Sequence, residues 1–411
     1  MILVPPSDSK KPERYYGMTK NQSIAKRVQD IGGESAYTVM AKAKELEKEG
    51  QSIIHLEIGQ PDFNTPNHII DSAIASLKKG ETKYTPSMGT PEFREVVAKY
   101  INKTRNVSIE KKDVVITPSG KMAITLAMMS VVNPGDEVIY PDPGFPIYEN
   151  MTRLLEAVPK SLAIVESKGF SLDVEELKSK INDKTKLIIL NSPSNPTGGI
   201  IPESDLKAIV ELAKEKEFYI LSDEIYSRIV YDGVKFPSIY SLGSQDQIFL
   251  VDGFSKTYAM TGWRLGFLAF PPHLELVMDN LAVNLFGCTP AFIQAAGISA
   301  LEGNQDEPDK MVREFEKRRD ILVDGLNRIE GITCLKPGGS FYVFPNVEGV
   351  RMNTQEFAKL LLKKYGVALL TGNAFGHNAP HYLRLSYANS IENIQAALRQ
   401  IEKAVQDINS Q

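Results

Sequence analysis

The stretch Ile248-Phe249-Leu250-Val251-Asp252-Gly253-Phe254-Ser255-Lys256 places a lysine shortly after a continuous apolar run. Four consecutive apolar residues predict a buried strand, so Lys256 is expected at the end of that strand, which is a poor place for a solvated charge. A lysine in apolar surroundings has a lowered pKa and can act as a neutral amine that forms a Schiff base with a carbonyl compound. The alternative is a surface lysine in a strand-to-loop turn, which is the commoner situation for a single lysine.

Similar apolar runs recur along the chain and alternate with helical patterns. The predicted strands span residues 53–56, 114–116, 137–140, 186–190, 218–221 and 248–251, and the clearest predicted helices span 36–49, 122–132 and 203–216. Continuously apolar strands separated by helices predict an α/β fold with a mostly parallel sheet that is covered by helices on both faces. In such sheets ligands bind at the carboxyl ends of the strands.

After about residue 300 the pattern changes and predicts a smaller α+β domain on the same chain. Its predicted elements are a long charged helix at 306–328, a strand at 341–344, a helix at 354–364 and a strand at 382–387. We therefore expect three units along the chain. They are an N-terminal arm of residues 1–35, a small domain made of 36–70 and 301–411, and a large domain of 71–300.

Composition narrows the class of protein. The 411 residues include 47 basic and 51 acidic side chains, for a net charge of -4, without a long block of like charge, so no nucleic-acid partner is expected. The first apolar residues run into Pro5-Pro6 and resemble no signal peptide. No segment approaches the roughly 18 apolar residues of a membrane helix. Cys288 and Cys334 are isolated, which favours a reducing, cytoplasmic location and no disulfide or metal site.

The segment Thr117-Pro118-Ser119-Gly120-Lys121 lies between a predicted strand and a predicted helix. A turn of small residues that leads into a helix N-terminus offers free backbone N–H groups and a favourable dipole to a phosphate group. Gly120 and Lys121 are therefore candidate phosphate ligands, although many α/β proteins need a glycine there only for the turn. The glycine spacing matches neither a dinucleotide fingerprint nor a P-loop.

Polar side chains also follow the next two predicted strands. Asn195 lies in a loop, residues 191–199, and the proline after it restricts it to extended conformations, so we interpret it as a ligand contact rather than part of a plain connection. Asp223 is either an ordinary helix N-cap or a buried carboxylate that pairs with a protonated pyridine nitrogen. Tyr226 would reach the same ligand from the first turn of the following helix.

Two arginines are candidate binders of carboxylate or phosphate groups. Arg264 follows Lys256 by eight residues, and Arg384 lies between Leu383 and Leu385. Single arginines are usually surface residues. A guanidinium within a strand of apolar neighbours, however, requires an anionic partner, and this argument favours a binding role for Arg384.

Together these motifs resemble the class I and II aminotransferases of the aspartate aminotransferase fold, which are fold type I pyridoxal phosphate enzymes. The resemblance runs from about Ala36 to Ile401 and rests on several motifs in order, namely Tyr84-Thr85-Pro86-Ser87-Met88-Gly89, residues 191–198, 222–226 and 255–266, and Arg384-Leu385-Ser386-Tyr387. It implies a large domain with a mostly parallel sheet, a smaller α+β domain, and pyridoxal 5'-phosphate as the cofactor.

The resemblance also implies roles for individual residues. Lys256 would form the Schiff base, Asp223 would pair with the pyridine nitrogen, and Tyr226 would join them as a catalytic residue. The other implied cofactor contacts are Asn195 with Tyr226 at the phenolic oxygen, Phe145 on the ring, Gly120, Lys121, Ser255 and Arg264 at the phosphate, and Tyr84 from the second subunit of a homodimer. Arg384 would bind the substrate α-carboxylate, with Asn195 and Gly59 nearby.

Two features depart from the aspartate-specific members of the family. Those members bring a cation to the distal carboxylate of the substrate, but residues 284–289 contain none, and the helix after Lys121 offers only Met128 and Met129. Strict specificity for dicarboxylates is therefore not expected. The N-terminal arm is also longer than the family pattern requires, and no role is assigned to it.

The implied function is the transfer of an amino group between an L-amino acid and a 2-oxo acid in a ping-pong cycle of pyridoxal and pyridoxamine phosphate. Aspartate, aromatic and neutral amino acids remain open as substrates, with 2-oxoglutarate and glutamate as the expected second pair. A pyridoxal phosphate-dependent lyase on the same fold is the nearest alternative. A cofactor-sensing regulatory domain is a more distant one, because it would need a DNA-binding module that the sequence does not supply.

Overall fold

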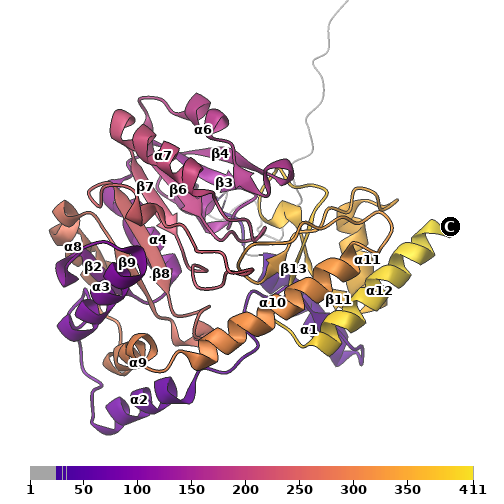
Figure 1. Ribbon diagram of the computed structural model, residues 1–411, viewed down its shortest axis with the longest axis horizontal. Coiled ribbons are helices and arrows are strands. Elements are labelled where there is room, and N and C mark those ends of the chain that lie inside the picture. The colour runs from indigo at the N-terminus through magenta and orange to yellow at the C-terminus, as the bar shows by residue number, and fades with distance from the viewer. Residues whose placement is uncertain (1–24, 30, 34, 411) are drawn as a thin grey trace, which may run out of the picture.

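The computed structural model describes residues 25–29, 31–33 and 35–410, and its centre is an eight-stranded sheet (Figure 1). Residues 1–24 of the predicted arm lie outside the described residues. In spatial order the strands are β2 (Val114–Thr117), β9 (Gly266–Ala269), β8 (Ile248–Gly253), β7 (Tyr219–Asp223), β6 (Thr185–Asn191), β3 (Glu137–Asp142), β4 (Val158–Val165) and β5 (Ser171–Leu172). The strands predicted at 114–116, 137–140, 186–190, 218–221 and 248–251 all belong to this sheet.

The sheet is mostly parallel, as predicted. The neighbouring pairs β8–β7, β7–β6, β6–β3 and β3–β4 are parallel, whereas β9 is antiparallel to both β2 and β8, and β5 is antiparallel to β4. The sequence prediction missed β9, β4 and β5. For β9 the reason is local, because the 3₁₀ helix η5 (Thr261–Trp263) takes the place of a crossover helix between β8 and β9, so the chain can only return antiparallel.

Helices cover both faces of the sheet, which confirms the predicted fold class. They are α2 (Asn67–Lys78), α3 (Pro91–Arg105), α4 (Gly120–Val131), α5 (Ile147–Leu154), α6 (Val174–Lys180), α7 (Glu203–Lys216), α8 (Glu275–Leu285) and α9 (Ala291–Glu302). Along β8, Ile248 and Leu250 belong to the apolar core on one face, and Phe249 and Val251 belong to the core on the other. This alternation follows from the two-residue period of a strand and explains why the whole run is apolar.

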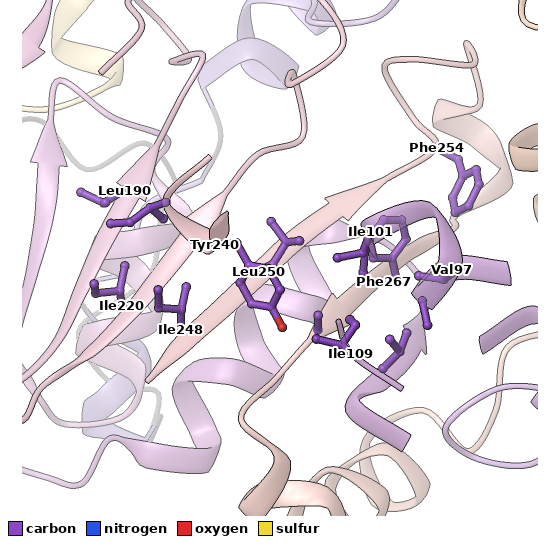
Figure 2. Packing of buried hydrophobic residues seen from close by; sticks show 14 of the residues in the cluster. Val97, Ile101, Ile109, Leu190, Ile220, Tyr240, Ile248, Leu250, Phe254 and Phe267 are labelled. Atoms are coloured by element: carbon purple, nitrogen blue, oxygen red, sulfur yellow. The ribbon is translucent and has the colours of Figure 1, made fainter. Parts of the chain in front are cut away.

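The core on the first face contains side chains of α3 and α7, and that on the second contains side chains of α4 and α8. Figure 2 shows the first of these cores from close by, with Val97 and Ile101 of α3 beside Phe267 of β9, and Ile220 beside Ile248 along the sheet. The two layers of helices fix the sheet from both sides and leave its carboxyl edge for side chains of the connecting loops.

A separate apolar core organises the C-terminal part of the chain. Its elements are α10 (Asp306–Leu326), α11 (Thr354–Tyr365), α12 (Ile391–Asn409), a sheet of β10 (Tyr342–Val343), β13 (Leu383–Ser386) and β12 (Leu370–Thr371), and a parallel pair of β1 (Ile54–His55) and β11 (Val367–Ala368). Helix α1 (Ser35–Lys48) lies beside β11 and β12. Figure 1 shows α10 extending from the region of α9 to this group of elements.

The predicted C-terminal helices and strands are all present, with the long helix ending at Leu326 rather than near residue 328. The domain boundaries at 35/36, 70/71 and 300/301 remain a prediction. Short 3₁₀ helices in the described part of the chain complete the elements: η1 (Lys26–Val28), η2 (Lys111–Asp113), η3 (Glu166–Lys168), η4 (Ile239–Ser241), η6 (Pro272–Leu274) and η7 (Gly372–Ala374). None of the helices in the described ranges is both long enough and apolar enough to cross a membrane.

A buried ion cluster joins α3 to the strands that carry the predicted site. Arg105, at the end of α3, donates to Glu224 Oε2 at 3.1 Å, to Asp252 Oδ2 at 3.0 Å and to Ser227 Oγ at 2.8 Å. Glu224 follows β7 directly, and Asp252 lies in β8. All three charged side chains are almost fully buried, so the arginine is the cation that compensates two buried carboxylates.

We expect Arg105→Met to lower the free energy of unfolding by about 3–5 kcal/mol, because two buried carboxylates would lose their cation. Urea denaturation followed by circular dichroism measures the change. Arg313→Met is the control, since Arg313 is exposed on α10 and its replacement should leave the transition unchanged. A transition of Arg105→Met that matches the control would show that the cluster contributes little to stability.

Candidate active site

Lys256 lies in the loop after β8, and its ammonium group reaches across to the segment that follows β1. Its Nζ donates a hydrogen bond of 2.6 Å to the carbonyl oxygen of Gly59 and lies 5.7 Å from the centre of the Phe341 ring. Burial is the main reason that the pKa of Lys256 falls from 10.5 to about 8, and the charges of Arg384, Arg264 and Lys121 lower it further. The sequence prediction of an amine with a lowered pKa agrees with these surroundings.

Gly59 permits this contact because it has no side chain. A β-carbon at this position would overlap the hydroxyl group of Tyr342. That hydroxyl lies 2.9 Å from the hydroxyl of Tyr226, and both rings are buried. The backbone after β1, the Tyr226–Tyr342 pair and Lys256 therefore meet at one point between the two parts of the chain.

Asp223 is the last residue of β7 and is buried. Its Oδ2 accepts a hydrogen bond of 2.8 Å from Tyr148, and its Oδ1 accepts one of 3.2 Å from the backbone N–H of Ile225. Burial raises the pKa of Asp223 to about 6, against the lowering effect of these hydrogen bonds. The alternative of an ordinary helix N-cap is wrong, because residues 225–228 form a turn and no helix begins there. Tyr226 accordingly extends from this turn and not from a helix.

Arg384, in the middle of β13, is a buried guanidinium with incomplete hydrogen bonding. It donates to Asn195 Oδ1 at 3.2 Å and to the carbonyl oxygen of Glu57, and its Nε is buried without a partner among the described residues. The rings of Tyr342 and Phe375 lie 4.4 and 4.9 Å from the guanidinium carbon. An arginine that is buried between two rings with an unused donor is suited to bind a carboxylate.

The predicted phosphate ligands gather where β2 and β8 end and where antiparallel β9 begins. Helix α4 begins at Gly120, so Gly120 and Lys121 form its first turn rather than the preceding loop, and Ser119 caps the helix by accepting the N–H of Met122 at 3.4 Å. A β-carbon on Gly266 would lie 2.8 Å from the backbone nitrogen of Gly120. The sheet edge and the helix N-terminus are thus in direct contact.

Cationic side chains surround this helix N-terminus. Lys121 Nζ lies 5.3 Å from the centre of the Phe145 ring, and burial together with the charge of Arg264 lowers the pKa of Lys121. Arg264 is exposed, has a left-handed backbone with φ of 57° and donates to the carbonyl oxygen of Thr261 at 2.8 Å. Ser255 is half-buried beside Lys256. The described residues contain no His, Cys, Asp and Glu cluster suited to a metal ion.

Tyr84 is the exception among the predicted residues. It is 97% exposed, so it packs against none of the others within this chain. The sequence reasoning in turn missed Tyr148, Tyr342 and Phe375. The first two make hydrogen bonds to residues 75 and 116 positions away, and all three belong to segments without a recognisable motif, so no local signal was available.

The fold and the site define an α/β enzyme that brings a half-buried amine, a buried carboxylate and a buried guanidinium together. The chain belongs to the aminotransferases of class I and II, whose family model matches residues 51–401. A probable aspartate/prephenate aminotransferase of Aquifex aeolicus is 38% identical over 94% of this chain and 100% of its own.

Solved structures agree with this assignment. The aspartate aminotransferase of Rhizobium meliloti superposes with a TM-score of 0.89 at 34% identity and covers 94% of this chain and 99% of that chain. The aromatic aminotransferase of Pyrococcus horikoshii has a TM-score of 0.84 at 34% identity and covers 90% of this chain and 99% of that chain. The family assignment and the fold predicted from the sequence are therefore confirmed.

We expect Gly59→Ala to lower the rate of amino-group transfer by about 10²-fold, because the new methyl group displaces Tyr342 and with it the contacts around Lys256 and Arg384. Steady-state kinetics with a saturating amino donor measure the change. Gly33→Ala serves as the control, since a β-carbon at Gly33 would meet nothing within 4 Å. Equal rates for the two variants would show that the position of Tyr342 is unimportant for the reaction.

Proposed function

We propose that this aminotransferase uses pyridoxal 5'-phosphate, held at the carboxyl edge of the large sheet, to move an amino group between an L-amino acid and a 2-oxo acid. The observation that carries the proposal is the convergence of half-buried Lys256 with buried Asp223 and Arg384, three charged groups from three distant segments. When bound, the cofactor supplies an aldehyde that bonds to amines and a pyridine ring that accepts electron density.

The donor groups at the site fit this cofactor. The N-terminus of α4, with Lys121, Ser255 and Arg264 around it, is suited to a phosphate group because it combines backbone N–H groups with positive charge. Phe145 would cover one face of the ring. Asp223 would hold the protonated ring nitrogen, and Asn195 and Tyr226 would donate to the phenolic oxygen.

Lys256 has two tasks in this proposal, namely covalent attachment of the cofactor and proton transfer. An amine with a pKa of about 8 is neutral in a substantial fraction of molecules near neutral pH, so it can attack a carbonyl carbon. Once an amino acid has displaced it, its Nζ would take the proton from the substrate Cα. The hydrogen bond to the Gly59 carbonyl holds the amine at this place.

Asp223 keeps a negative charge in an apolar position. Tyr148 and the Ile225 N–H stabilise the ionised carboxylate, and their hydrogen bonds oppose the effect of burial. A carboxylate that faces a ring nitrogen keeps the nitrogen protonated, and the protonated ring stabilises negative charge that develops at the substrate Cα. Asp223 would thus act throughout the reaction without leaving its position.

Arg384 would bind the substrate α-carboxylate and thereby orient the Cα–H bond toward Lys256. Its buried, unpaired Nε is a donor that a bidentate carboxylate would satisfy. Asn195 fixes one side of the guanidinium, and the rings of Tyr342 and Phe375 fix its plane. These contacts leave the arginine little freedom to turn away from the site.

A dicarboxylic amino acid such as aspartate is the substrate that we favour, with 2-oxoglutarate and glutamate as the second pair. The Aquifex aeolicus and Rhizobium meliloti proteins are named for aspartate, and the Pyrococcus horikoshii protein is named for aromatic substrates. Lys121 supports the first choice, because its cation lies over the ring of Phe145, which would cover the cofactor, and could there pair with a distal carboxylate. This cation is Lys121 itself rather than a residue of 284–289 or of the helix that follows it.

We further propose a cytoplasmic homodimer in which Tyr84 completes the site of the other subunit. The 97% exposure of this tyrosine supports the proposal, since a large aromatic side chain with no cover in its own chain is suited to contact another. Leu276 and Val283 on α8 are exposed apolar side chains of the same kind, at 71% and 54%.

The first test mixes the purified holoprotein with each amino acid and follows the absorbance of the bound cofactor. At least one amino acid should convert the spectrum and release its 2-oxo acid, and Lys256→Ala should lack both the original band and the conversion, because the attaching amine is gone. Lys44→Ala, on the exposed side of α1, is the control and should behave as wild type.

Two outcomes would contradict the proposal. Retention of the original band in Lys256→Ala would show that another group holds the cofactor. Release of ammonia with the oxo acid, without a need for a second oxo acid, would favour the lyase alternative on this fold.

A second test separates the two roles open to Lys121. If Lys121 binds a distal carboxylate, Lys121→Met should lower kcat/KM for aspartate by about 10²-fold and leave that for phenylalanine within a few fold, since the lost interaction is a buried charge-assisted one. Cofactor affinity, measured by equilibrium dialysis, should then stay unchanged. Equal losses with both substrates together with weaker cofactor binding would assign Lys121 to the phosphate instead.

A further inference from the structure

A row of hydrogen bonds connects the surface of the protein to Arg384. His55 in β1 lies at its centre, with ring Nε2 3.1 Å from Glu47 Oε1 on α1 and ring Nδ1 2.7 Å from Glu57 Oε1. The backbone carbonyl of Glu57 in turn accepts a hydrogen bond from the Arg384 guanidinium. One histidine therefore links a partly exposed carboxylate to the buried arginine of the site.

Glu57 is the unusual member of this row. Its side chain is fully buried, and its Oε2 has no hydrogen-bond partner among the described residues. Burial is the main reason that the pKa of Arg384 is lowered, and the neighbouring groups Tyr342, Tyr226 and Glu57 act in the opposite direction. The guanidinium donates to the main-chain carbonyl of Glu57, so the carboxylate of the same residue lies within the length of one side chain of it. His55 bonds this carboxylate directly, and Arg384 bonds the backbone that carries it.

The surroundings of His55 favour its protonated form. Burial alone would lower the pKa of His55, but the hydrogen bonds and charges of Glu57 and Glu47 raise it above the ordinary value of 6.5. The paired strand β11 presents only Ala368 opposite His55, and Asn389 contributes a neutral amide to the His55 carbonyl at 3.0 Å. Among the described residues, the two charged groups that hydrogen-bond to the His55 ring are the carboxylates of Glu47 and Glu57.

We propose that His55 and Glu57 are positioning residues that adjust the carboxylate affinity of Arg384. Protonated His55 neutralises Glu57, so that the guanidinium presents its positive charge to the substrate carboxylate. When His55 loses its proton, the negative charge of Glu57 is no longer neutralised by the histidine. This charge then partly offsets the positive charge of Arg384 and repels an entering carboxylate. The inference rests on the proposed role of Arg384 as the carboxylate-binding residue.

The sign of the effect follows from the raised pKa of His55. Carboxylate affinity is highest while His55 is protonated and falls as the pH rises through its pKa, which lies above 6.5. Coupling between two binding events is reciprocal, so a bound carboxylate must also make His55 harder to deprotonate. A histidine that only joins α1 to β1 would show no such response to a ligand.

The direct test is a titration of His55 in the holoenzyme by NMR of histidines labelled with ¹³C at Cε1. The chain has five histidines, so the resonance is assigned with His55→Gln. Succinate and 3-phenylpropionate serve as probes, because they carry a carboxylate but no amino group to transfer. We expect a bound probe to raise the pKa of His55 and to leave that of the exposed His381 unchanged.

The second measurement is the dissociation constant of the same probes from about pH 6 to about pH 8.5, which brackets histidine titration. The wild-type Kd should rise about fivefold more over this range than that of Glu57→Gln, which lacks the competing charge. His55→Gln should bind with the weaker, high-pH affinity throughout. The titration of Lys256 and of the cofactor should affect the pH dependence of Kd equally in the wild type, Glu57→Gln and His55→Gln. It therefore cancels when the three proteins are compared.

The outcomes separate this inference from the function on which it rests. If Arg384→Lys weakens probe binding but the probe leaves the pKa of His55 unmoved, the coupling is wrong and the role of Arg384 stands. If the probes do not bind the wild type, or bind Arg384→Lys equally well, then the role of Arg384 is wrong and the coupling fails with it.

Discussion

The burial of three charges at one edge of the sheet is the constraint on which the rest of the structure depends. Asp223 and Arg384 are buried and Lys256 is half-buried, and in each case burial is the largest influence on the pKa. Buried charges are tolerated only when neighbouring dipoles or opposite charges compensate them. The carbonyl of Gly59, the hydroxyl of Tyr148 and the amide of Asn195 provide that compensation.

These compensating groups come from both parts of the chain, namely the large sheet with its helices and the C-terminal group of elements. The site therefore forms only when the two parts are packed together. Gly59 follows β1 and Arg384 lies in β13, both in the C-terminal group of elements. Asp223, in contrast, ends strand β7 of the large sheet, and Lys256 follows β8. The apolar core of the C-terminal part includes Tyr226 from the loop after β7, which ties the two together. The continuous packing explains how a hydrogen bond between residues 197 positions apart is kept at 2.6 Å.

The architecture was predictable from the sequence because its signals are local. The apolar runs of β8 and β6 reflect burial on both faces of the sheet, and their ends locate Lys256 and Asn195 without knowledge of the fold. Antiparallel β9 was not predictable by the same rule, because the rule assumes a crossover helix between successive strands. The helix N-cap alternative for Asp223 is wrong because the residues after β7 form a turn. Tyr226 and Ile229 of this segment pack into the apolar core of the C-terminal part.

The parts of the site that the sequence did not reveal include the aromatic partners of the charged groups. Tyr148, Tyr342 and Phe375 are aromatic residues of a kind that fills many cores, and their functional contacts depend on which segments meet in space. The charged residues were predictable because burying a charge is costly and therefore conspicuous in an apolar strand. A buried tyrosine gives no comparable signal in the sequence. Its hydroxyl can nevertheless stabilise a neighbouring charge, as that of Tyr148 does for Asp223.

The charge distribution around Lys256 also explains why the site should work best when filled. Besides burial, the charges of Arg384, Arg264 and Lys121 lower the pKa of the amine, and the charge of Asp223 raises it. A phosphate group at the α4 N-terminus and a carboxylate at Arg384 would each neutralise one source of the lowering. The amine is therefore least basic in the empty site and more basic once both anions are bound, where under the proposed function it would accept a proton from carbon. The cations proposed to bind the ligands would thus also adjust the basicity of Lys256.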